Sequence, residues 1–145
     1  MNYIGNLNGI SQKYLYFRTQ ATDADDDAAG DSALFPASSL TGMQPTADDS
    51  LTLYFKSMLR GSGNEGAADA VASLDNNDSV IVTIPANTHL TAMKAIIKAI
   101  NTGSNLIIIA NDDSGGTEYL SESGITACGT ISVACLLYTS DAADE

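Results

Sequence analysis

Alternation of apolar and polar side chains is the feature that most limits how this chain can fold. A period of two places one set of side chains on each face of a β-strand, so that one face can be buried and the other left in water. We expect strands wherever this pattern occurs, which is in Lys13–Gln20, Ser50–Leu59, Ser79–Ala86 and Ile125–Val133. A fifth strand is expected at Asn105–Asp112, whose apolar, β-branched run is typical of a strand that is covered on both faces.

One segment has the period of a helix instead. Its apolar side chains recur at spacings of three and four, which gives a single apolar stripe along residues 88–102: Leu90, Met93, Ile96, Ile97 and Ile100. Strands that outnumber helices predict an α+β fold, built on a mainly antiparallel sheet or a small barrel-like sandwich with one amphipathic helix. The length favours a single domain over residues 1–134, with residues 1–12 as a loose end.

The charge balance excludes some partners. Eighteen acidic residues face six basic ones, for a net charge of −12. Such a chain repels phosphate backbones, so we expect no nucleic acid as a partner. The sequence predicts neither a signal peptide nor a membrane span, and hence no membrane partner.

The stretch Ala21–Ser32 is acidic and holds the sharpest candidate site. Three of its aspartates alternate as they do at the start of a calcium loop, but positions six and twelve, counted from Asp23, are Ala28 and Leu34. The EF-hand interpretation therefore fails. Two alternatives stay open, a solvated acidic loop and a looser divalent-cation site whose ligands would be Asp23, Asp25, Asp27 and Asp31.

Candidate catalytic groups are few. His89 lacks the partners that a zinc site or a nucleophilic triad needs, and Cys128 stands among small residues where a buried, inert thiol is expected. We therefore expect a protein that is not an enzyme. Three tyrosines, Tyr14, Tyr16 and Tyr54, predict either an aromatic assembly face on neighbouring strands or ordinary cross-strand packing.

The last eleven residues, "CLLYTSDAADE", are of another kind. Cys135–Glu145 resembles the translation of a transposon-end sequencing adapter over its whole length. This resemblance implies that Cys135–Glu145 is an artefact tail, and that the C-terminus of the natural protein lies beyond Ala134 and is not in this sequence.

Residues Tyr14–Ala134 resemble small uncharacterised proteins of marine tailed bacteriophages that are grouped with virion structural genes. The stretches that carry the resemblance are "YLYFRTQATDADDD", "FPASSLTGMQPTADDSLTLYFKSM" and "SVIVTIPANTHLTAMKAIIKAIN". It implies a capsid-associated or decoration protein that acts through self-association or binding to capsid proteins. The alternative is a phage-encoded intracellular binding protein that either depends on a cation held by its acidic loops or is directed at a host protein. The resemblance implies a location in the virion or in the host cytoplasm. An enzyme is the third alternative.

Overall fold

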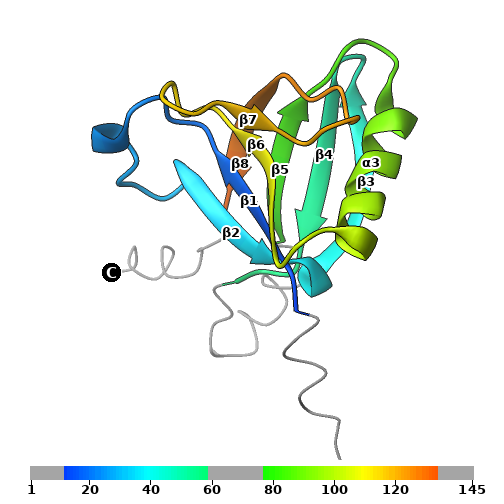
Figure 1. Ribbon diagram of the computed structural model, residues 1–145, viewed down its shortest axis with the longest axis horizontal. Coiled ribbons are helices and arrows are strands. Elements are labelled where there is room, and N and C mark those ends of the chain that lie inside the picture. Colours follow the sequence, from blue (N-terminus) through cyan, green and yellow to red (C-terminus); the bar gives the residue numbers. More distant parts are fainter. Residues whose placement is uncertain (1–11, 59–76, 134–145) are drawn as a thin grey trace, which may run out of the picture.

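In the part of the chain that the structure describes, two four-stranded sheets and one α-helix make up the fold (Figure 1). The computed structural model describes residues 12–58 and 77–133. Sheet A has the order β2 (Ser32–Pro36), β1 (Tyr14–Arg18), β6 (Leu106–Asn111) and β7 (Glu118–Tyr119). Sheet B has the order β3 (Leu40–Ala47), β4 (Ser50–Phe55), β5 (Asp78–Thr83) and β8 (Ala127–Ser132). The helix is α3 (His89–Thr102), and two short 3₁₀ turns are η1 (Asp23–Asp25) and η2 (Ala37–Ser39). The predicted α+β, sandwich-like class is confirmed.

Every strand pair is antiparallel except β1 and β6. The exception follows from the path of the chain, which leaves sheet A after β2, builds β3, β4 and β5 of sheet B, and returns to sheet A through α3. A parallel neighbour needs a long crossover of this kind. The register places Tyr14 opposite Leu106 and Tyr16 opposite Ile108.

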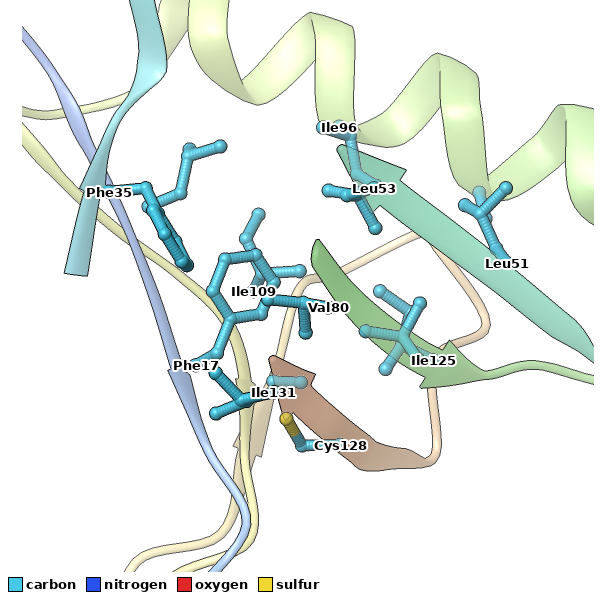
Figure 2. Packing of buried hydrophobic residues seen from close by; sticks show 14 of the residues in the cluster. Phe17, Phe35, Leu51, Leu53, Val80, Ile96, Ile109, Ile125, Cys128 and Ile131 are labelled. Atoms are coloured by element: carbon cyan, nitrogen blue, oxygen red, sulfur yellow. The ribbon is translucent and has the colours of Figure 1, made fainter. Parts of the chain in front are cut away.

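The core lies between the two sheets and is made by alternate residues of their strands (Figure 2). Leu15 and Phe17 of β1 point inward, as do the alternating residues of β4 and β5, and all are fully buried: Leu51, Leu53, Phe55, Val80 and Val82. Helix α3 contacts β3, β4 and β6 and adds Ala92 and Ile96 to the same core. The inward faces are those that the alternation predicts.

Strand ends and one burial pattern differ from the predictions. The run Gln44–Asp49 is rich in residues that favour turns, and it would end β3 early, but β3 continues to Ala47 and the turn is reduced to Asp48 and Asp49. Strand β6 was expected to be covered on both faces, and this is wrong because Leu106 is 53% exposed. Only the inward face of β6 meets sheet B, so a continuous apolar run does not imply two covering layers here.

The last strand breaks its own alternation. Simple alternation places Cys128 and Ile131 on opposite faces, yet both are buried. The ladder shifts register there, because Val82 pairs with Cys128 while Val80 pairs with Ile131, three residues further along. Such a bulge turns the rest of the strand over. It coincides with Gly129, where a Cβ would lie 2.9 Å from the carbonyl oxygen of Ile81.

The expected tail Cys135–Glu145 and the expected loose end, except Gln12, lie outside the described residues.

Candidate functional site

The acidic loop between β1 and β2 folds around Arg18, the last residue of β1. The Arg18 side chain is only 8% exposed, and its guanidinium nitrogens lie 3.0 Å from Asp23, 3.6 Å from Asp113 and 3.9 Å from Asp26. Burial disfavours the charged guanidinium, but the hydrogen bond that it donates to Asp23 and the charge of Asp113 outweigh this and raise the pKa of Arg18. Part of the acidic cluster therefore neutralises a cation that the sheet has buried.

Three of the four carboxylates of the predicted cation site have partners of their own, and that of Asp23 is Arg18. Asp31 accepts hydrogen bonds from the backbone N–H of Asp27 at 3.2 Å and of Ala28 at 2.7 Å. Asp25 accepts one from the hydroxyl of Thr22 at 2.7 Å. Within residues 12–58 and 77–133, no group of three or more His, Cys, Asp or Glu side chains is arranged to hold a metal ion. The loop's cation site stays a prediction.

A second polar cluster joins the two sheets, and sequence reasoning missed it. The Asp112 carboxylate, just beyond β6, accepts a hydrogen bond from the hydroxyl of Tyr119 at 2.5 Å. It also accepts the backbone N–H of Cys128 in sheet B, at 3.1 and 3.2 Å. In the sequence, Asp112 stands in the run Asn111–Asp113, which is typical of a turn, and nothing marks a partner sixteen residues away.

This cluster shifts the titration of two side chains. Burial, followed by the hydrogen bond to Asp112, raises the pKa of Tyr119 to about 12. Burial and the negative charge of Asp112 raise the pKa of Cys128 to about 12. A thiol that holds its proton this strongly is a poor nucleophile at neutral pH. The hydrogen bonds of Asp112 connect β6, β7 and β8, so the cluster has a structural role.

His89 has a structural contact too. Its Nε2 lies 2.8 Å from the carbonyl oxygen of Ala47 and 3.1 Å from that of Ser50. Because carbonyl oxygens only accept hydrogen bonds, this nitrogen must carry the proton. The imidazole thus ties the first turn of α3 to the hairpin between β3 and β4.

A hollow of about 380 Å³ lies between the C-terminal half of α3 and the segment β6–β7. Its walls combine small and apolar groups, among them Ala99, Ile107 and Leu120, with the charged Lys98 and Glu122. These two side chains are exposed and form an ion pair at 3.1 Å. Because both ions are exposed to water, this ion pair contributes little to the stability of the fold.

Exposed apolar side chains gather on two surfaces of the described residues, and the first is the outer face of sheet A. Five side chains of three adjacent strands form it: Tyr14, Tyr16, Leu34, Leu106 and Ile108. Tyr14 is 37% exposed, Leu34 46% and Leu106 53%. The predicted grouping of Tyr54 with Tyr14 and Tyr16 is wrong, because Tyr54 belongs to β4 in the other sheet. Leucines and an isoleucine complete the surface instead.

The second exposed surface lies on α3, and we call it the helix patch. It consists of Leu90, Met93, Lys94, Ile97 and Lys98, which line a shallow depression on the solvent side of the helix. Leu90 is 63% exposed and Ile97 is 45% exposed. The helical period places both residues on the apolar stripe, but Ala92, Ala95 and Ile96 face the core more directly. The apolar surface of α3 is therefore wider than its contact with the sheets.

No protein-family model, curated protein or solved structure matches this chain. No helix in the described part of the chain has both the length and the apolar character that crossing a membrane requires.

Proposed function

We propose that this protein is a non-enzymatic structural protein of a bacteriophage particle, associated with the capsid or decorating it, and that it acts by self-assembly. The observation that carries the proposal is the outer face of sheet A. There Tyr14, Leu34 and Leu106 stand exposed on three hydrogen-bonded strands. The resemblance to phage proteins grouped with virion structural genes supports the particle as the setting.

The outer face of sheet A is informative because its apolar side chains adjoin one another. A single exposed leucine is common on protein surfaces, but a continuous apolar patch marks a contact surface. In the register of sheet A, Tyr16 stands opposite both Leu34 and Ile108, so that these side chains adjoin across three strands. Tyrosine is well suited to such a contact because it buries a large ring at low entropic cost and keeps a polar tip.

The net charge of −12 agrees with an assembly of this kind. Like charges keep copies of a protein apart wherever acidic surfaces meet, and this directs association to surfaces that carry few carboxylates. Such selectivity suits a protein that has to stay dispersed until it meets its proper neighbour.

The titrating groups support a non-enzymatic protein. The two clearly shifted acids, Tyr119 and Cys128, both have a pKa of about 12, which removes them from chemistry at neutral pH. Catalytic groups are usually shifted toward neutrality instead. Arg18 is almost fully buried and already pairs with Asp23 and Asp26 of its own loop and with Asp113 beyond β6, so that its charge is matched within the fold.

Mass spectrometry of purified particles tests the proposal. In a phage that encodes this chain, we expect its peptides in the particle fraction, in a constant ratio to the major capsid protein across a density gradient. A replication protein of the same phage is the control and should stay behind. If peptides of this chain appear in infected cells but not in particles, the structural function is wrong and an intracellular binding protein takes its place.

A further inference from the structure

We propose that copies of this protein associate head to tail, with the helix patch of one copy against the outer face of sheet A of the next. This inference rests on the self-assembly proposed above and names its two contact surfaces. Each surface is apolar at its centre, and the two differ in the charges at their borders.

The border of the helix patch is positive. Helix α3 contains Lys94 and Lys98 and not a single acidic residue, in a chain whose net charge is −12. Lys98 pairs with Glu122, whereas Lys94 has no ion pair within the described residues. The patch is thus a local positive surface around Leu90 and Ile97.

The border of the outer face of sheet A is negative on one side. The pairing of Tyr16 with Leu34 is followed along the ladder by that of Arg18 with Ser32, where the acidic loop begins and ends. The Asp23 side chain is 91% exposed although it also contacts Arg18. Asp25 and Asp27 lie on the same loop, and Asp25 is exposed. The apolar strands therefore adjoin exposed carboxylates.

The charges at the two borders favour contact between the helix patch and the outer face of sheet A over contact between two helix patches. If two helix patches met about a two-fold axis near the middle of α3, Lys94 would approach its counterpart in the other copy, and like charges in a closing interface repel. Against the outer face of sheet A, the same lysine approaches carboxylates instead. A contact between two different surfaces repeats from copy to copy, and it gives a ring if the rotation closes and an open array if it does not.

A mixing experiment separates the two kinds of pairing. One variant of the full chain, Leu90→Gln with Ile97→Gln, removes the centre of the helix patch. The other, Leu34→Gln with Leu106→Gln, removes the centre of the sheet face. All four side chains are exposed, so both variants should keep the wild-type circular dichroism spectrum and melting temperature. Sedimentation velocity of each variant alone, and of an equimolar mixture, is the measurement.

Head-to-tail pairing predicts that each variant alone sediments as a monomer. It also predicts that the mixture forms a one-to-one dimer that does not grow, because each dimer exposes only the two damaged surfaces. If the helix variant alone still forms dimers, or if the mixture stays monomeric while the wild type assembles, the inference is wrong and self-assembly stands. If the wild type itself is monomeric, self-assembly is wrong as well.

A charge substitution tests the same contact without removing apolar area. Lys94→Glu should weaken self-association by about tenfold or more, since it places a carboxylate opposite carboxylates. Lys56→Glu changes the net charge equally at an exposed lysine outside the patch, and it is the matched control. Equal effects of the two substitutions would contradict a contact at Lys94.

Discussion

Phe35 of β2 stacks on Phe55 of β4, with ring centroids 4.1 Å apart and ring planes within 6° of parallel. The two rings come from different sheets, so this contact joins sheet A to sheet B. Phe17 meets both rings edge-on, at 6.1 Å from Phe35 and 6.0 Å from Phe55. Aromatic contacts of these geometries add to the free energy of simple burial.

Replacing Phe35 by alanine should therefore separate the sheets locally. We expect Phe35→Ala to lower the free energy of unfolding by about 3–5 kcal/mol, because it removes a fully buried ring and leaves a cavity. The matched control is Leu34→Ala on the opposite, exposed face of the same strand, where we expect less than about 1 kcal/mol. Urea unfolding measures both, and similar losses would contradict the assignment of the two faces.

A side chain at Gly129 should destabilise the fold. The Cβ of Gly129→Ala would lie 2.9 Å from the carbonyl oxygen of Ile81 and 3.4 Å from its Cβ, at the bulge between β5 and β8. We expect a loss of about 1–3 kcal/mol, because backbone rather than a flexible side chain would have to move. Gly42→Ala is the control, since its Cβ would meet no atom within 4 Å. An unchanged midpoint of thermal unfolding for Gly129→Ala would disprove the close approach.

Alkaline pH should destabilise the fold through Tyr119 and Cys128. In the folded protein their pKa values rise from ordinary values of 10.0 and 9.0 to about 12. The unfolded chain thus loses these protons at lower pH than the folded protein does. The stability that the two protonated groups contribute is therefore fully present below about pH 9, and it is lost as the pH rises toward about 12.

Tyr119→Phe removes one of the two titrating groups and should make this fall smaller. The control is Tyr14→Phe, on the exposed face of the same sheet, which keeps the contacts of Asp112 and therefore the full fall. Urea unfolding at pH values on either side of the window gives both slopes. A fall of the same size in both variants would exclude Tyr119 as a contributor.

The strands themselves could be predicted because their burial follows a local period. Alternation places Leu15 with Phe17, and Val80 with Val82, on one face of a strand without knowledge of their neighbours. These are the faces that the fold buries. The distribution of strands between two sheets could not be predicted in this way. It separates Tyr54 from Tyr14 and Tyr16, and it depends on pairings between distant segments that a local period does not encode.

The candidate surfaces were only partly predictable for the same reason. The aromatic face was anticipated through Tyr14 and Tyr16, but its other members come from β2 and β6, which adjoin β1 only in the folded chain. The exposure of Leu90 depends on which side of a broad apolar stripe the sheets occupy. The bulge at Gly129 depends on a register that the partner strand sets.

Self-assembly can be measured directly by sedimentation velocity of the full chain, from micromolar to hundreds of micromolar, in a reducing buffer so that Cys135 cannot cross-link copies. A variant that ends at Ala134 serves as the control for association through the tail. We predict species heavier than the 15.0 kDa monomer that grow with concentration, both with and without the tail. A single monomer at every concentration, or association that disappears with the tail, would contradict a protein that works by assembling with itself.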